Sequence, residues 1–171
     1  MMNDSVALLI RPATPADAPA LLAIYTPIVR DTAISFEYEP PGVDQFAGRI
    51  ASISEEYPWL VAETEEGEIL GYAYASRYRT RAAYDRSVES TVYVAEKARG
   101  RGVGRALYAR LFALLKEQGI RMVYAIITIP NAGSVGLHDT FGFKTIGVHR
   151  NAGFKFGVWH EVVWMDKDLW E

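Results

Sequence analysis

The chain has 171 residues, of which half are hydrophobic and 23% are charged, so it is large enough for one folded domain and too apolar for a disordered chain. Its net charge of −3 argues against a nucleic-acid-binding protein, which usually carries a basic excess. The absence of cysteine excludes disulfides, cysteine metal sites and a cysteine nucleophile, and no apolar run reaches the ~18 residues that span a bilayer.

The N-terminal part of the chain predicts a strand followed by a helix. Residues 7–11 form a short apolar run that ends at Pro12, which is typical of a strand. Thr14-Pro15-Ala16-Asp17 has the composition of a helix start, because threonine caps, proline suits the first turn and aspartate favours the positive end of the helix dipole. Pro27 is expected to kink or end this helix, and residues 32–38 predict a short strand.

The middle of the chain predicts a second helix and three strands. Asp44 is expected to cap the helix. Residues 59–62 and 69–78 are predicted to form the two strands of a hairpin, because an acidic turn with glycine separates them. A third strand, rich in β-branched residues, is predicted over residues 88–95.

The C-terminal part contains the clearest helix of the chain. It is predicted over residues 102–118, where leucines recur on one face, and Gly119 is expected to stop it. Residues 123–129 form a continuous apolar run that predicts a buried strand, and residues 134–141 predict a short helix. The last strands are expected over residues 143–148 and 159–165. Strands and helices mix without a linker, so we expect one α+β or α/β domain over residues 1–171.

Positive charge is concentrated in one segment of this acidic chain. Residues 77–105 hold eight basic and three acidic residues, a local charge of +5. A single basic stretch in an acidic protein indicates a local anion site. The alternative is a chance cluster on a solvated face, and charge alone does not separate the two.

A glycine-rich segment lies between the strand at 88–95 and the helix at 102–118. Its sequence is Arg99-Gly100-Arg101-Gly102-Val103-Gly104-Arg105. Glycines let the backbone approach a ligand, and the amides of a helix N-terminus favour negative charge, so this arrangement predicts phosphate or pyrophosphate binding. The spacing matches neither the dinucleotide fingerprint, which would need glycine at Arg105 or Leu107, nor the Walker pattern.

The spacing Arg99-x-x-Gly102-x-Gly104 after a strand resembles the acyl-CoA pyrophosphate loop of GNAT-type N-acetyltransferases. Downstream, Asn131-Ala132-Gly133-Ser134 and the segment 137–143 resemble the family's next motif, in the same order and on the same kinds of element. The resemblance narrows to the phosphinothricin and methionine sulfoximine or sulfone N-acetyltransferase group through the three segments 57–62, 89–94 and 152–160. One departure is Phe156, where the phosphinothricin enzymes tend to carry histidine.

This resemblance implies an acetyltransferase fold and a cosubstrate. We expect a mixed, mostly antiparallel central sheet flanked by helices and splayed after the 88–95 strand, so that acetyl-CoA enters beside the 123–129 strand. The expected partners are acetyl-CoA and a small-molecule amine, with no metal, nucleic acid or membrane. The resemblance also implies a homodimer, with the aromatic stretch 154–170 as a source of interface. Met1–Ser5 lacks the basic start of a signal peptide, so a cytoplasmic location is expected.

The predicted catalytic residues are a carboxylate and a histidine. Glu89 is the expected general base for the substrate amine, because it alternates with Thr91 and Tyr93 onto one strand face and matches the subgroup's catalytic carboxylate. His138 is expected either to donate a proton to the leaving thiolate or to orient Glu89 or a water molecule. The amide of Val94, or of a neighbour on its strand, is expected to stabilise the oxyanion.

The predicted binding residues divide between cosubstrate and amine. Those expected to hold acetyl-CoA are Val92, Tyr93, Val94, Arg99, Gly100, Arg101, Gly102, Val103, Gly104, Arg105, Asn131 and Ser134. For the amine, Arg79 is expected to meet the substrate carboxylate, and Phe36, Tyr84 and Phe156 to wall the pocket. For Arg79 a solvated strand edge is at least as good an interpretation, and aromatic residues at positions such as 36 and 156 more often belong to the protein core than to a pocket.

The sequence is also compatible with two alternative functions. An enzyme of the same fold would acetylate a protein or peptide α-amine, or another amine, and a peptide screen distinguishes it. A non-catalytic acyl-CoA-binding module would keep the glycine loop but would have no use for Glu89 or His138. The presence of both residues favours an enzyme.

Overall fold

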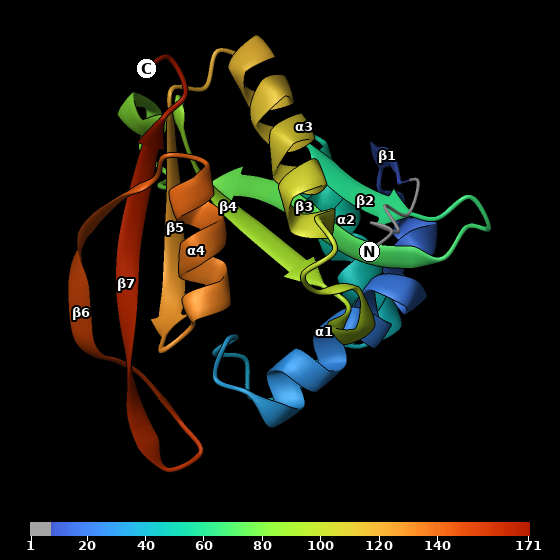
Figure 1. Ribbon diagram of the computed structural model, residues 1–171, viewed down its shortest axis with the longest axis horizontal. Helices are drawn as coiled ribbons and strands as arrows, with labels where there is room; N and C mark the ends of the chain where they lie inside the picture. The colour runs from blue at the N-terminus through green and yellow to red at the C-terminus, as the bar shows by residue number, and fades with distance from the viewer. Residues whose placement is uncertain (1–7) are drawn as a thin grey trace, which may run out of the picture. The chain divides into compact units, whose positions relative to one another are not determined.

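The structure is a computed structural model that describes residues 8–171. Its strands are β1 (Leu9–Pro12), β2 (Trp59–Glu63), β3 (Ile69–Arg77), β4 (Ser87–Val94), β5 (Met122–Ile129), β6 (Lys144–Lys155) and β7 (Val158–Asp168). Its α-helices are α1 (Ala18–Asp31), α2 (Val43–Ser54), α3 (Val103–Glu117) and α4 (Ala132–Thr140) (Figure 1). Within this part of the chain the strands form one seven-stranded sheet in the order β1-β2-β3-β4-β5-β7-β6. The pairs β1–β2, β2–β3, β5–β7 and β6–β7 are antiparallel and β4–β5 is parallel, which confirms the expected mixed, mostly antiparallel sheet.

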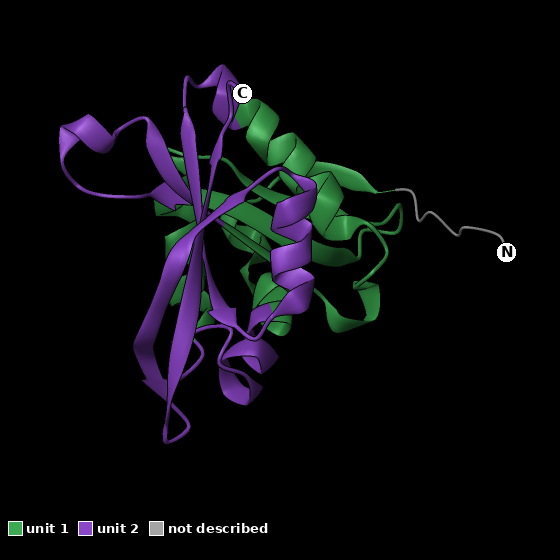
Figure 2. Ribbon diagram, turned by 60° about the vertical axis from the view of Figure 1, so that its left-hand side comes forward, with its two compact units in different colours: residues 1–24, 41–75, 91–114 green, residues 25–40, 76–90, 115–171 purple. Residues whose placement is uncertain are grey.

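The chain divides into two compact units, each assembled from three separate stretches (Figure 2). The first unit takes the chain up to Ile24, then Pro41–Ala75 and Thr91–Leu114. The second takes Tyr25–Pro40, Ser76–Ser90 and Leu115–Glu171. Strand β4 therefore contributes its first residues to the second unit and its last residues to the first.

The first unit packs β3 closely against its neighbours at Gly71. A Cβ atom at this position would lie 2.9 Å from the carbonyl oxygen of Tyr93 and 3.1 Å from Cγ1 of Val103. Val103, Leu107 and Leu111 on α3 are buried, as the apolar stripe predicts. Glycine at 71 thus lets β3 approach both the end of β4 and the start of α3, which flank the glycine-rich segment.

The second unit is built on long antiparallel ladders. Strand β5 pairs with β7 along its whole length, from Met122 opposite Asp168 to Ile129 opposite Glu161. The parallel register of β4 with β5 covers three pairs, ending at Glu89 opposite Tyr124, while both strands continue further along the chain.

Several expected elements are confirmed, and some of their details are wrong. The helix start at 14–17 is present as a short 3₁₀ turn in which the Asp17 carboxylate accepts a hydrogen bond from the Thr14 amide. Helix α1 does not end at Pro27 but continues to Asp31. Asp44 does not cap α2, because the helix begins one residue earlier, after Gly42, and Asp44 lies in its first turn.

Three strand predictions also need correction. Residues 32–38 are not a strand, because their backbone carbonyls turn toward a buried side chain described below. Strand β5 is buried on one face only, since Ile126 is 36% exposed and its buried residues alternate. The final hairpin is far longer than expected, because β6 runs to Lys155 and β7 begins at Val158. Ala7 of the first predicted strand and the Met1–Ser5 segment lie outside the described residues.

Candidate active site

Glu89 lies on β4 within the second unit, directly opposite Tyr124 in the parallel register. Its carboxyl group is largely desolvated, and this burial raises its pKa above the ordinary value, although the positive charge of Arg79 opposes the rise. A carboxyl group with a raised pKa is a stronger base when ionised than an exposed one. The position and the electrostatics of Glu89 therefore suit proton abstraction.

Aromatic rings from three elements gather beside the predicted substrate arginine. Tyr78, just after β3, stacks on Tyr124 with 4.2 Å between ring centroids and meets Tyr84 edge-on at 5.7 Å. The Arg79 guanidinium carbon lies 4.8 Å from the centre of the Tyr78 ring. The structure thus brings the predicted residues Arg79 and Tyr84 to one aromatic group. Sequence reasoning missed Tyr78 and Tyr124, although Tyr78 sits between two arginines at the end of a predicted strand.

Phe36 also lies in the second unit, where it packs against the β6–β7 hairpin. Its ring faces Gly153, where a Cβ atom would lie 2.3 Å from Cε2, and its centroid is 6.2 Å from that of His160. Phe36 and Phe156 are 36% and 60% exposed, so neither is a core residue. Among residues 8–171, no ring contact joins either of them to the aromatic group of Tyr78, Tyr84 and Tyr124.

His138 is buried in α4 at 2% exposure. Its Nδ1 lies 2.7 Å from the carbonyl oxygen of Ser134, and because a carbonyl only accepts, Nδ1 carries the proton. The ring also packs edge-on against Phe143 at 4.9 Å. Burial lowers the pKa of His138, so the imidazole is neutral with its lone pair on Nε2.

Asn131 and Ser134 form the N-terminal cap of α4. The Asn131 side-chain oxygen accepts a hydrogen bond of 3.1 Å from the Ser134 amide. This contact explains the spacing of the motif as a helix start. It also places the Ser134 carbonyl where His138 donates to it, so the cap and the histidine are connected. Contact of these residues with acetyl-CoA stays a prediction.

The glycine-rich segment belongs to the first unit and leads into α3. Gly100 and Gly102 have positive φ angles of 73° and 83°, conformations that favour glycine. Arg99, Arg101 and Arg105 are exposed, and Val103 is buried as the first residue of α3. Backbone amides of the first helical turn lack partners within the helix. Free amides, exposed guanidinium groups and the positive end of the helix dipole together fit a pyrophosphate.

The remaining cosubstrate residues lie at the end of β4. Val92, Tyr93 and Val94 are half-buried, and the following amide, that of Ala95, donates to the Leu70 carbonyl at 2.8 Å. The end of β4 is thereby held against β3. Among residues 8–171 no group of three metal-ligating side chains is present, and no helix has the length and apolarity needed to cross a membrane.

Comparisons with known proteins agree with this geometry. The family model described as acetyltransferase (GNAT) domain matches residues 10–164. A phosphinothricin N-acetyltransferase from Streptomyces viridochromogenes is 40% identical over 160 residues, covering 94% of this chain and 87% of that protein. An L-methionine sulfoximine/L-methionine sulfone acetyltransferase from Pseudomonas paraeruginosa is 36% identical and covers 94% of each chain.

A solved structure of an acetyltransferase is also similar to this chain over most of its length. A phosphinothricin acetyltransferase from Sinorhizobium meliloti, crystallised in complex with acetyl-CoA, superposes with a TM-score of 0.90 at 34% identity. The match covers 94% of this chain and 88% of that one. The family match over residues 10–164 includes β4, the glycine-rich segment and α4.

Proposed function

Because the chain belongs to the GNAT acetyltransferase family, we propose that it transfers acetyl from acetyl-CoA to the primary amine of a small amino-acid analogue, of the phosphinothricin, methionine sulfoximine or methionine sulfone type. The family match, together with a similar structure solved in complex with acetyl-CoA, confirms the resemblance seen in the sequence. The observation that carries the choice of chemistry is Glu89, a desolvated carboxyl group with a raised pKa beside the positive charge of Arg79.

In the proposed reaction Glu89 takes a proton from the substrate ammonium group, directly or through water. The free amine then attacks the thioester carbonyl, the new C–N bond forms and the C–S bond breaks. The electron pair of the C–S bond leaves with the thiolate of CoA, which gains one proton. The balance is one ammonium and one acetyl-CoA giving one amide, one free thiol and one proton released to solvent.

Acetyl-CoA is proposed to bind along the chain from Val92 to Arg105. The amides of Gly100 to Arg105 and the three arginines of this segment would hold the pyrophosphate. Backbone groups of Val92 and Val94, flanking Tyr93, would pair with the pantetheine arm in the manner of an added strand, and the Val94 amide would stabilise the oxyanion. Asn131 and Ser134 would contact the distal part of CoA. Two glycines at positive φ and three exposed arginines support this assignment.

The amine substrate is proposed to bind through its carboxylate to Arg79. The stack of Tyr78 on Tyr124, with Tyr84 at its edge, supplies a flat apolar wall beside this charge. Phe36 is proposed to close the pocket from the α1–α2 loop. Because Phe156 departs from the phosphinothricin pattern, all three analogue types are compared in the thiol-release screen.

His138 is proposed to act as an acceptor rather than as an acid. Its Nδ1 proton is held by Ser134 and its pKa is lowered, so the neutral ring has no second proton to give. Of the two roles expected from the sequence, the orientation of Glu89 or of a relaying water is therefore the better supported.

We further propose that residues 1–171 act as one acetyltransferase domain, in the cytoplasm and as a homodimer. The family match runs through both compact units, which supports a single domain. The β6–β7 hairpin exposes six large apolar side chains, which supports a protein interface. They are Ile146, Val148, Phe154, Phe156, Val158 and Trp159.

A thiol-release screen with acetyl-CoA tests the substrate proposal. Phosphinothricin, methionine sulfoximine and methionine sulfone are compared with their N-blocked forms, with polyamines and with peptides that have free α-amines. Release with at least one analogue and none with its N-blocked form is expected. Release with peptides alone would replace this function by protein acetylation, and CoA binding without release on any amine would leave a binding module.

A further inference from the structure

Lys155, the last residue of β6, is a buried cation that the proposed reaction does not use. Its side chain is 3% exposed. The ammonium group donates hydrogen bonds to the carbonyl oxygens of Val29 at 2.6 Å, Thr32 at 2.8 Å and Ser35 at 2.7 Å. A lysine ammonium has three donors, so all of them are committed to these carbonyls.

The three acceptors belong to the end of α1 and to the segment that follows it. Val29 lies in the last turn of α1, where carbonyls lack helical partners and a cation is favoured by the helix dipole. Thr32 and Ser35 belong to the irregular segment 32–38. Burial lowers the pKa of Lys155, while nearby Glu37 opposes this shift. A buried ammonium with three backbone acceptors therefore specifies the path of this segment.

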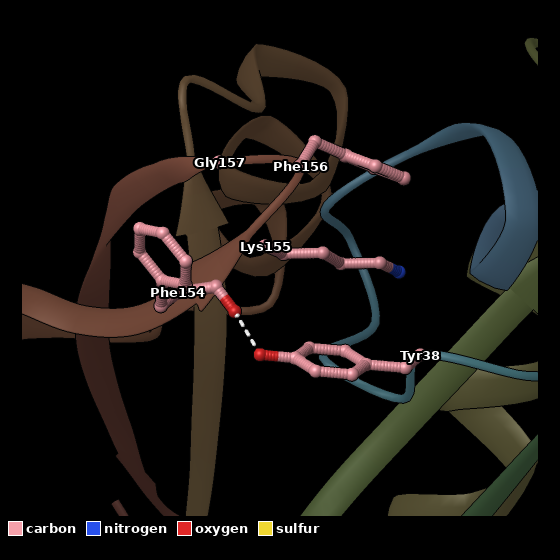
Figure 3. Close-up of a pocket in the computed structure, with 5 residues that line it drawn as sticks. All are labelled: Tyr38, Phe154, Lys155, Phe156 and Gly157. Atoms are coloured by element: carbon pink, nitrogen blue, oxygen red, sulfur yellow. Dashed lines mark hydrogen bonds between the residues drawn. The ribbon is translucent and has the colours of Figure 1, made fainter.

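Side chains hold the same segment from other directions. The Tyr25 hydroxyl lies 2.7 Å from Oγ of Ser35 and donates to Glu37 at 3.2 Å. The Tyr38 hydroxyl donates to the Phe154 carbonyl at 2.8 Å, so the segment touches β6 on both sides of Phe36. Figure 3 shows the Lys155 side chain extended between those of Tyr38 and Phe156, at a shallow pocket of about 280 Å³.

The β6–β7 hairpin also shapes the seat of the Phe36 ring. Gly153, two residues before Lys155, leaves the space that the ring occupies, because a Cβ atom there would lie 2.3 Å from Cε2. The turn that follows Lys155 consists of Phe156 and Gly157 with φ angles of 55° and 76°, as a tight type I′ hairpin requires. The hairpin therefore contacts the segment 32–38 twice: Lys155 binds its backbone carbonyls, and Gly153 leaves room for the Phe36 ring.

We propose that Lys155 is a positioning residue that, together with Gly153, sets the place of Phe36 in the amine-substrate pocket and so contributes to substrate specificity. This inference rests on the proposed function, in which Phe36 closes that pocket. Lys155 acts through the segment 32–38 and touches no reacting atom. A purely structural lysine would lower the stability of the protein without separating the Michaelis constants of its two substrates.

The test compares Lys155→Met and Gly153→Ala with two controls on the same strand. Lys144→Met removes an exposed lysine, and Gly147→Ala adds a Cβ atom where nothing lies within 4 Å. We expect KM for the amine to rise about tenfold in both test variants, because small displacements of binding groups are costly, with KM for acetyl-CoA changed less than about twofold. The controls should match the wild-type protein in both constants.

Hydrogen exchange of the segment 32–38 provides a readout independent of turnover. In Lys155→Met its amides should exchange about tenfold faster, whereas in Lys144→Met they should not change. If Lys155→Met does not fold, Gly153→Ala alone carries the kinetic test, since its Lys155 is intact. Equal changes in both Michaelis constants, or unchanged exchange, would overturn the positioning role. A wild-type protein inactive on every amine would instead overturn the proposed function.

Discussion

His138 donates its Nδ1 proton across 2.7 Å to the carbonyl oxygen of Ser134, one helical turn earlier in α4. The same residue, Ser134, gives its amide proton to the Asn131 cap, so the start of α4 and the tautomer of His138 are set together. The arrangement leaves the reactive lone pair on Nε2. Burial makes the protonated imidazole unfavourable in the folded protein and so lowers the pKa of His138, although the hydrogen bond to Ser134 opposes this shift.

A substitution of His138 by asparagine separates these two properties. The asparagine amide can still donate to the Ser134 carbonyl, but it has no counterpart of Nε2. We expect kcat to fall by about 10²-fold or more, while the melting temperature near pH 7.5 stays within a few degrees of the wild-type value. Unchanged kcat in a folded His138→Asn protein would remove His138 from the reaction.

The lowered pKa of His138 also predicts a pH dependence of stability. In the unfolded chain the imidazole takes up a proton near pH 6.5, whereas in the folded protein it does so only at lower pH. The contribution to the free energy of unfolding is therefore complete above pH 6.5 and is lost as the pH falls toward the folded-state pKa. Denaturant melts from pH 7.5 to 5.5 should show a steeper decline for the wild-type protein than for His138→Asn, and parallel declines would contradict the assignment.

The burial of Glu89, which suits a catalytic base, is expected to lower the stability of the folded protein at neutral pH. Its pKa is raised on folding, so its favourable contribution exists below about pH 4.5 and is lost as the pH rises through the folded-state pKa. Glutamine has a similar shape and no charge to desolvate. We expect Glu89→Gln to melt higher than the wild-type protein at pH 7, with the difference shrinking at pH 4.5. A variant less stable than wild type at pH 7 would show that attraction to Arg79 outweighs burial.

Gly71 offers a test of how the glycine-rich segment is supported. Alanine at this position would drive its Cβ atom against the Tyr93 carbonyl and the Val103 side chain, and backbone cannot move aside cheaply. We expect Gly71→Ala to lose roughly 1–3 kcal/mol of unfolding free energy and to weaken acetyl-CoA binding by calorimetry. Gly48→Ala in α2 is the matched control, because nothing lies within 4 Å of its added Cβ atom. Equal behaviour of the two variants would contradict the close approach.

The arginines of the glycine-rich segment should act on acetyl-CoA alone. Replacement of Arg99, Arg101 or Arg105 by glutamine is expected to raise KM for acetyl-CoA by about tenfold, because a hydrogen bond to a charged group contributes roughly 1.5–3 kcal/mol. KM for the amine should not change. Since these side chains are exposed, added salt should weaken acetyl-CoA binding in the wild-type protein more than in the variants. Arg110→Gln, an exposed α3 position, serves as the control.

Local patterns in the sequence predict much of this fold. The leucine stripe and Gly119 predict α3 closely, and Gly119 indeed has a positive φ of 78°. The segment 32–38 escapes prediction because its β-like composition is overridden by the ammonium of Lys155, more than a hundred residues away. Similarly, nothing local shows that Ile126 lies on an exposed face of β5.

In the candidate site, too, some residues could be predicted from local sequence and others depend on contacts between distant segments. Glu89, Arg79 and the glycine-rich segment could be predicted from the sequence because their residue types and spacing indicate their chemistry. Within the second unit, Tyr124 lies opposite Glu89 only through the β4–β5 strand register, and Tyr78 stacks on Tyr124. Lys155 lies within a recognisable motif, but its role depends on acceptors that the motif does not contain.

The central claim, that Glu89 is the base of an acetyl-CoA-dependent N-acetylation, is tested most directly by the pH profile of thiol release. Wild-type protein and Glu89→Gln are compared with the preferred amino-acid analogue at saturating acetyl-CoA, from pH 5 to pH 9. We predict a wild-type rate that rises with pH as Glu89 ionises, and a variant slower by about 10²-fold or more at neutral pH. A Glu89→Gln variant with the full wild-type rate and the same profile would contradict it.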